Sequence, residues 1–356
     1  MSSVHPTWPW QTEPLQIALQ QLTSHAVLLH GVPGIGQFEF ALGMARSWLC
    51  EGHGPHEARA QGSAGQAACG NCVSCKLIDA GSHPDLMVIL PEALQAQYGW
   101  QTDGQYEADA AGDKAGKSKK LSQEIKVDAI RAVVQFAQHT ASRGRAKVIV
   151  IHPAESLNLV AANTLLKTLE EPPGLVRFVL SGSALDSLLP TVRSRCQAWR
   201  LPLPGQEQAV QWLQSEIPGL SEADAQVLLQ ASGEQPLTAR ERHALGVDGR
   251  YWAQIPKEVA QGQSSKWASW PLPLQVEMLQ KLCHDLACVA AGAAPRYFPV
   301  VSLPPAPDLG RLTAWAVELR KAQRHAEHPW NAGLKTEALL QQARLVLRVK
   351  PATAAK

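Results

Sequence analysis

A glycine-rich turn between a short apolar run and a helical pattern constrains the fold of this chain most strongly. The apolar run covers residues 26–29, the turn contains Gly31, Gly34 and Gly36, and helical spacing of apolar residues follows over 38–49. A strand, a glycine loop and a helix in this order are typical of the first unit of a nucleotide-binding α/β domain. The sequence therefore predicts a P-loop-like domain with a parallel sheet.

Three further apolar runs predict the other strands of this sheet. They cover residues 85–90, 148–151 and 177–180, and helical patterns at 125–138 and 161–169 lie between them. Short apolar runs that alternate with helices indicate a mostly parallel sheet covered by helices on both faces. The fold class that we expect for this part of the chain is therefore α/β.

The chain of 356 residues is long enough for two to three domains. After the prolines at 202–204 no convincing strand follows, and the remaining apolar patterns are helical. We expect an α/β domain over 1–203, a small helical domain over 204–244 and an all-α domain over 245–356. Within the first domain, the polar segment 91–123 contains clusters of Gly and Lys, which predicts a flexible surface insertion.

Charge and hydropathy exclude some classes of protein. With 33 basic and 31 acidic residues, the net charge is only +2, which argues against a protein that coats nucleic acid by bulk charge. No stretch reaches the roughly 18 apolar residues of a membrane-spanning helix, and the first 20 residues lack the pattern of a secretory signal. We expect a cytoplasmic protein with reduced thiols.

The glycine loop lacks the residues that act on ATP. Working loops of this type continue with Lys, which meets the β- and γ-phosphates, and with Ser or Thr, whose hydroxyl holds Mg²⁺. Gln37 and Phe38 occupy these positions, and the strand at 147–151 is followed by His152 instead of a carboxylate, with Glu155 two positions too late. We expect the three glycines to form a vestigial phosphate loop without tightly bound ATP or Mg²⁺.

Four cysteines predict a metal site. Cys69, Cys72 and Cys75 follow one another in Cys-x-x-Cys steps, and Cys50 lies at the end of the helical pattern upstream. Four thiolates form the closed shell of a structural Zn²⁺. A redox dithiol needs only two cysteines, and an iron–sulfur cluster usually has other spacing, so both remain as weaker alternatives. The sequence favours structural zinc within residues 50–75.

A Ser-Arg-Cys tripeptide is the third candidate site. Ser194, Arg195 and Cys196 lie in the α/β domain shortly before its proline-rich exit. The tripeptide alone is weak evidence, because surface arginines are common. An arginine at this place could nevertheless reach the phosphates bound by a neighbouring subunit.

Together these features resemble the delta-prime family of subunits of the bacterial DNA polymerase III clamp loader, which belongs to the AAA+ class. The altered loop at 31–38, the four cysteines, Leu-Leu-Lys-Thr-Leu-Glu-Glu-Pro-Pro at 165–173 and Arg-Ser-Arg-Cys at 193–196 carry the resemblance. It is specific from about residue 28 to 201. Gly-Glu-Gln-Pro at 233–236 is similar to a turn of the family's lid domain, and 328–340 is similar to the last helix of its collar domain.

The resemblance implies a subunit without ATPase or polymerase activity of its own, although it is a component of a DNA polymerase holoenzyme. Such a subunit joins gamma/tau and delta subunits in a hetero-pentamer that places the sliding clamp on primed DNA at the bacterial replisome. By motif match, Arg195 would be an arginine finger presented in trans to ATP on an adjacent gamma/tau subunit. Ser194 and Cys196 would shape the turn.

Two other functions stay open at this point. A stand-alone AAA+ ATPase would need the missing Lys and Ser or Thr, and nucleotide binding by the isolated chain would reveal it. A zinc-dependent DNA-binding protein would bind DNA as a monomer with strong salt dependence, and the net charge of +2 gives it little support.

Overall fold

A computed structural model describes residues 7–53, 65–100, 121–264, 266–326 and 331–348. The chain forms two compact units, Met1–Pro204 and Gly205–Lys356, which we describe separately. The sequence predicted a change of architecture at this point. The further division of the second unit into a lid and a collar domain stays a prediction.

The first unit contains a five-stranded parallel sheet. Its strands are β1 (Ala26–His30), β2 (Leu86–Ile89), β3 (Lys147–Ile151), β4 (Val176–Gly182) and β5 (Gln197–Arg200). The order across the sheet is β2-β3-β4-β1-β5, and every neighbouring pair is parallel. The predicted α/β fold class is therefore confirmed.

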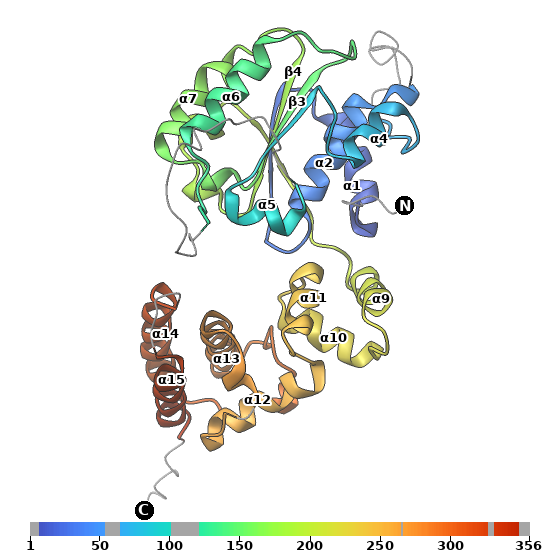
Figure 1. Cartoon of the computed structure of the whole chain (residues 1–356). Helices are drawn as coiled ribbons and strands as arrows, with labels where there is room; N and C mark the ends of the chain where they lie inside the picture. The colour runs from blue at the N-terminus through green and yellow to red at the C-terminus, as the bar shows by residue number, and fades with distance from the viewer. Residues whose placement is uncertain (1–6, 54–64, 101–120, 265, 327–330, 349–356) are drawn as a thin grey trace, which may run out of the picture. The chain divides into compact units, whose positions relative to one another are not determined.

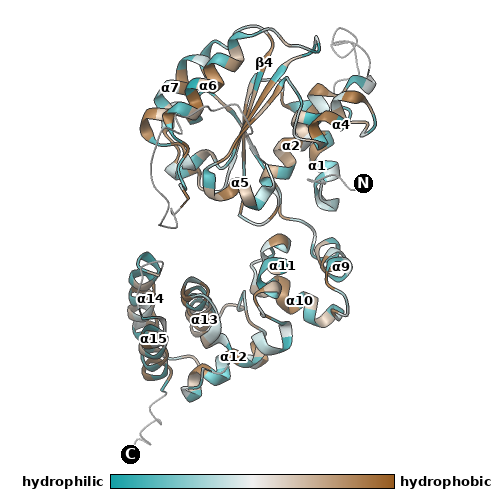
Figure 2. Ribbon diagram, in the orientation of Figure 1, coloured by the Kyte–Doolittle hydropathy of each residue, from teal (hydrophilic) through white to brown (hydrophobic). Residues whose placement is uncertain are grey.

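Helices cover both faces of the sheet, as Figure 1 shows. One face carries α1 (Thr12–Gln21), α2 (Gln37–Leu49) and α4 (Val73–Asp79), and the other carries α6 (Val127–Gln138), α7 (Leu159–Glu170) and α8 (Pro190–Arg193). Successive residues of β1 enter opposite cores: Val27 and Leu29 face α2, whereas Ala26 and Leu28 face α7. Burial on both faces explains why β1, β2, β3 and β4 consist mainly of apolar residues (Figure 2).

Two elements differ from the sequence-based expectation. β5 was missed, because Gln197–Arg200 alternates half-buried and exposed residues at the sheet edge and has no apolar run. The segment 91–123 was expected to be a flexible insertion, but its start forms α5 (Glu92–Tyr98). Ala, Leu and Gln favour a helix there, and Gly99 ends it with a left-handed φ of 59°. Residues 101–120 of that prediction lie outside the described residues.

The second unit is helical over the residues that the structure describes. Its α-helices are α9 (Gln206–Glu216), α10 (Glu222–Ala231), α11 (Pro236–Ala244), α12 (Gly249–Gln261), α13 (Leu272–Ala290), α14 (Leu309–Arg324) and α15 (Ala332–Leu347). Trp252 stacks on Phe298 at 4.7 Å between ring centroids and forms part of its core. Among the described residues of both units, none of the helices combines the length and the apolar character needed to cross a membrane.

Candidate functional sites: a closed phosphate loop, a cysteine cluster and an arginine turn

The glycine loop lies between β1 and α2, as the sequence predicted, and Gln37 closes it from inside. Gly34 and Gly36 have left-handed φ angles of 73° and 86°. The Gln37 side chain is 6% exposed, and its amide donates hydrogen bonds to the carbonyls of Gly31, at 3.1 Å, and Val32, at 2.6 Å. The residue in the place of the catalytic lysine therefore binds the loop's own backbone.

The segment before α1 closes the loop from the other side. The Gln11 amide donates to the carbonyls of Ile35, at 2.9 Å, and Gly36, at 2.6 Å, and the Trp10 indole also donates to Ile35 at 2.9 Å. A Cβ atom built on Gly36 would lie 2.5 Å from both the Gln11 amide nitrogen and the Trp8 ring. These side chains thus occupy the space directly against the loop.

Phe38 stands where a working loop has the hydroxyl that holds Mg²⁺, and it belongs to the core. Its side chain is fully buried, and its ring lies 4.3 Å from that of Tyr98 and 5.4 Å from that of His152 between centroids. His152, the residue after β3, shares a 3.0 Å hydrogen bond between Nδ1 and the Ser181 hydroxyl. Burial lowers the pKa of His152 to about 4, so its imidazole is neutral near pH 7.

Glu155 is the nearest carboxylate in sequence after β3, and it is committed to the backbone of a neighbouring loop. Its Oε1 atom accepts hydrogen bonds from the backbone N–H groups of Ser183, at 2.9 Å, and Ala184, at 3.2 Å. The Ser183 hydroxyl lies 3.1 Å from the same oxygen. Glu155 therefore holds the chain beyond β4 in position.

The four predicted cysteines come together beyond the C-terminal end of α2. Cys50 caps this helix, and the four sulfur atoms of Cys50, Cys69, Cys72 and Cys75 lie within 4.8 Å of one another. The sulfur atoms of Cys50 and Cys72 are 3.9 Å apart. Tetrahedral zinc with Zn–S bonds of about 2.3 Å places its sulfur ligands about 3.8 Å apart. The cluster can therefore hold a metal ion of this kind.

The surroundings of the cluster shift the pKa values of its thiols in both directions and hold the four side chains in place. Backbone N–H groups of Asn71 and Cys72 lower the pKa of the Cys69 thiol to about 6, whereas burial raises that of Cys75. Next to Cys50, the Glu51 carboxylate accepts hydrogen bonds from the Arg143 guanidinium, at 2.6 Å, and the Ser74 hydroxyl, at 2.9 Å. These bonds tie both arms of the cysteine loop to the chain before β3.

The arginine turn, residues 190–196, leads into β5. It contacts the C-terminal end of α7 through Arg195 and Glu170. Val192 is fully buried, and Cys196 packs its half-buried side chain against the same core. Burial raises the pKa of the Cys196 thiol to about 12, so it acts as a neutral packing group. The Ser194 hydroxyl donates to the Thr191 carbonyl at 3.1 Å. These contacts hold the turn against the core, and the part predicted for Ser194 and Cys196 in presenting Arg195 stays a prediction.

Arg195 projects from this turn and remains partly accessible. One guanidinium nitrogen donates to the Thr191 carbonyl at 2.8 Å, and the other contacts the Glu170 carboxylate at 2.6 Å. The side chain is 27% exposed. Its Nε atom is buried without a hydrogen-bond partner among the described residues. Arg195 thus offers a charged fork at the surface, and its role in ATP chemistry stays a prediction.

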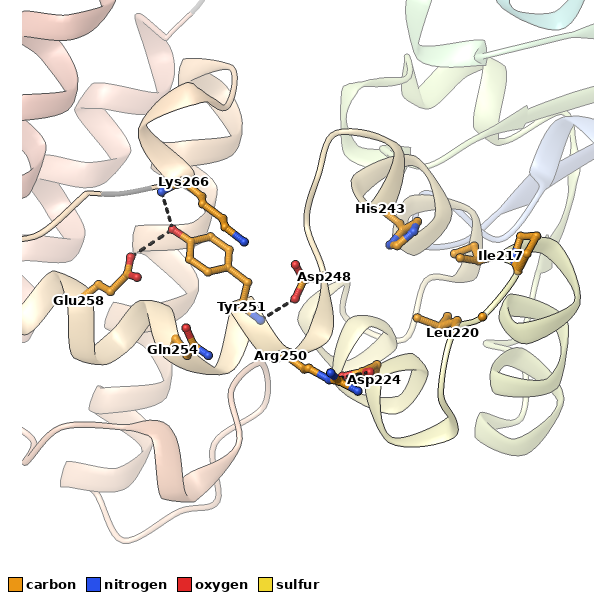
Figure 3. Close-up of a pocket in the computed structure, with 12 residues that line it drawn as sticks. Ile217, Leu220, Asp224, His243, Asp248, Arg250, Tyr251, Gln254, Glu258 and Lys266 are labelled. Carbon is orange, nitrogen blue, oxygen red and sulfur yellow. Dashed lines mark hydrogen bonds and ion pairs between the residues drawn. The ribbon is translucent and has the colours of Figure 1, made fainter.

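A separate pocket of about 550 Å³ lies in the second unit, beside α12 (Figure 3). Several of its polar side chains bind one another: Arg250 pairs with Asp224 at 3.3 Å, and the Tyr251 hydroxyl donates to Glu258 at 3.1 Å. The Asp248 carboxylate accepts from the backbone N–H of Tyr251 at 2.6 Å. None of the site residues predicted from the sequence lines this pocket.

The three predicted sites are therefore separate places. The loop and the cysteines lie at opposite ends of α2, whose 13 residues span roughly 20 Å. The sequence analysis missed the contacts that Trp8, Gln11 and Tyr98 make at the loop, and it gave Glu170 no part in holding Arg195. Trp8 and Gln11 lie 20 or more residues from the loop, so no local spacing pattern marks them. Glu170 belongs to the motif at 165–173 that the sequence analysis singled out, but nothing in the sequence indicated that it contacts Arg195.

Comparisons with known proteins agree on the family. A family model described as "DNA polymerase III, delta subunit" matches residues 12–204. A DNA polymerase III subunit delta' from Pseudomonas aeruginosa is 35% identical over 277 residues, which cover 75% of this chain and 73% of the relative. One from Yersinia pestis is 35% identical, with 58% of this chain and 51% of the relative covered.

Among solved structures, a DNA polymerase III gamma subunit-related protein from Thermotoga maritima aligns with 95% of this chain and 100% of its own. Its TM-score is 0.42 and its sequence identity is 15%. The family match covers more than half of the present sequence, and the Pseudomonas relative extends the similarity into the helical unit. This chain belongs to the DNA polymerase III delta subunit family, with the delta' proteins as its relatives.

Proposed function

We propose that this chain is a clamp-loader subunit that does not hydrolyse ATP and that completes the ATP site of a neighbouring subunit. The observation that supports the absence of ATP hydrolysis is the packing and bonding of Gln37 and Phe38. Gln37 binds the loop carbonyls, and Phe38 is fully buried against Tyr98 and His152. Binding Mg-ATP would require a free loop, a cation and a metal-holding hydroxyl.

Arg195 supports the second half of the proposal. A guanidinium keeps its charge at all physiological pH values and matches the geometry of phosphate oxygens with two parallel donors. Arg195 is partly exposed on a turn whose neighbours are anchored in the core. A rigid turn with an accessible arginine suits the transition-state charge on a γ-phosphate held by another chain. Arg195 acts as the arginine finger, with Ser194 and Cys196 shaping its turn.

In this proposal the partners are gamma/tau subunits, which bind ATP, and a delta subunit, together in a hetero-pentamer. The complex places the sliding clamp on primed DNA. This chain is the partner that stays unchanged while its neighbours bind and hydrolyse nucleotide. The assignment of partners rests on family membership, since the relatives are named as subunits of DNA polymerase III.

DNA-stimulated ATP turnover of the reconstituted loader tests this function. Arginine fingers contribute about 10³–10⁵ in rate at the site that they serve, so Arg195→Ala should clearly lower turnover and clamp loading while the complex still assembles. Arg193→Ala is the matched control, because Arg193 is exposed on the same turn and lies 3.6 Å from Asp186. Unchanged turnover with Arg195→Ala would refute the finger, and Mg-ATP hydrolysis by the isolated chain would refute the non-hydrolysing part.

We also propose that the cysteine cluster holds one structural Zn²⁺. Four sulfur ligands leave no open position for a substrate, so the ion would stabilise the loop around the cysteines. Metal analysis of the purified protein should find about one zinc per chain, and Cys75→Ser should lower that content. Cys288→Ser should retain the metal, because Cys288 lies on α13 outside the cluster. Iron instead of zinc, or equal metal content in both variants, would contradict the assignment.

A further inference from the structure

The last residue of α7 makes the closest charged contact with the proposed finger. An oxygen of the Glu170 carboxylate lies 2.6 Å from a terminal nitrogen of Arg195, which is the distance of a charge-assisted hydrogen bond. The Thr191 carbonyl accepts from the other terminal nitrogen at 2.8 Å. Two acceptors on different elements therefore hold the guanidinium at two points.

We propose that Glu170 is a positioning residue that holds the Arg195 guanidinium in the orientation in which it meets the neighbouring subunit's nucleotide. This inference rests on the proposed function of Arg195. Glu170 itself touches neither nucleotide nor metal in this proposal. It acts only through the arginine, and the chemistry that it serves is recognition of a nucleoside triphosphate by a fixed cation.

Both members of the pair stand on rigid supports. Leu165 and Leu169 of α7 are fully buried, so the end of this helix is held against the sheet. On the other side, Val192 is fully buried and Cys196 packs against the same core. A contact between two anchored elements has a defined direction, whereas an arginine on a free loop would sample many rotamers.

The arrangement leaves donors for a phosphate. A guanidinium has five N–H bonds, and the two contacts described above use two of them. The remaining N–H groups of the two terminal nitrogens can bind phosphate oxygens while Glu170 and Thr191 keep their contacts. Glu170 is 55% exposed, so its second oxygen can stay hydrated and the pair does not need a fully desolvated environment.

Holding the side chain in advance affects the rate, because a free arginine loses rotamer freedom when it binds. The cost of immobilising one long side chain corresponds to about a two- to ten-fold change in rate. Without Glu170, the Thr191 carbonyl would be the one acceptor left to Arg195 among the residues that the structure describes. We therefore expect a loss smaller than that caused by removing the arginine itself.

The test uses the complete reconstituted loader and a double-mutant cycle. Glu170→Ala should lower kcat for DNA-stimulated ATP turnover by about two- to ten-fold with little change in KM for ATP, because the neighbouring subunit binds the nucleotide. Glu170→Gln should restore most of the rate, because its amide oxygen still accepts a hydrogen bond. Glu171→Ala is the matched control, since Glu171 is the adjacent exposed carboxylate and should leave turnover unchanged.

The arginine-free background separates positioning from general damage. In loaders that carry Arg195→Ala, adding Glu170→Ala should cause no further loss, because the residue that Glu170 positions is gone. An equal loss in both backgrounds would overturn the inference, as would unchanged turnover with Glu170→Ala alone. If Arg195→Ala has no effect, the proposed function fails first; if only the Glu170 variants behave like wild type, the finger stands without its positioning residue.

Discussion

The glycine loop and the arginine turn belong to the same α/β unit but use their polar groups in opposite ways. At the loop, the carbonyls of Gly31, Val32, Ile35 and Gly36 accept hydrogen bonds from glutamine side chains of the same chain. At the turn, the Arg195 guanidinium is partly exposed. These loop carbonyls are therefore satisfied within the chain, whereas the turn leaves part of a charged group accessible from outside.

In the proposed function, the loop binds no nucleotide and Arg195 serves a neighbouring subunit. A position that has lost its ligand can be filled by side chains, and it then contributes to stability like any other part of the core. A charged group that serves a ligand outside the chain gains little stability for the chain itself. Mutations should therefore affect folding at the loop and function at the turn.

The largest expected effect is the loss of stability when Phe38 is truncated. The Phe38 side chain is fully buried and contacts Tyr98 and His152, so Phe38→Ala should lower the free energy of unfolding by about 3–5 kcal/mol. Urea unfolding followed by circular dichroism measures this change. Leu175→Ala is a suitable control, because that side chain is 61% exposed and should change stability by less than about 0.5 kcal/mol.

A small effect of Phe38→Ala would mean that Phe38 contributes little to the core. The claim that mutations at the loop mainly affect folding would then be wrong. A gain of Mg-ATP binding would contradict it more directly. Truncation alone adds neither the missing cation nor a metal-holding hydroxyl, so we expect no nucleotide binding by this variant.

The sequence predicted the α/β frame and the meeting of the four cysteines, because each has a local pattern. Apolar runs mark buried strands, and Cys-x-x-Cys steps bring sulfur atoms together whatever surrounds them. It could not predict β5, whose alternating exposure follows from its place at the sheet edge. It also missed Gln11, whose role depends on how the chain before α1 packs against a loop about 25 residues away.

A lower pH should have an intermediate effect on stability through His152, which packs against Phe38. His152 has a pKa of about 4 in the folded chain, below the usual 6.5, because it is buried. As pH falls from about 6.5 towards 4, the unfolded chain binds a proton at His152 that the folded chain does not. Stability should therefore decrease over this window, and His152 should account for about 2 kcal/mol of the loss between pH 7 and 5.

The comparison of wild type with His152→Gln isolates this contribution, because other titrating groups are common to both proteins. The difference in unfolding free energy between them should change by about 2 kcal/mol from pH 7 to 5, with the wild type losing more. Parallel pH profiles would indicate that His152 is accessible to protons in the folded chain. This result would contradict the buried packing of His152 against Phe38.

The smallest expected change in stability is that of Arg195→Ala, which tests the claim that mutations at the arginine turn leave folding intact. Arg195→Ala removes a salt bridge whose acidic partner is 55% exposed, and such pairs contribute little to stability. The Nε atom of Arg195 is buried without a partner among the described residues, so removing the side chain also relieves an unsatisfied donor. We expect the free energy of unfolding to change by less than about 0.5 kcal/mol in the same urea assay.

A loss of several kcal/mol would identify Arg195 as a structural residue, and a fall in loader turnover could then no longer be attributed to an arginine finger. A near-neutral change, with turnover reduced, would separate the outward charge of the turn from the internal bonding of the loop.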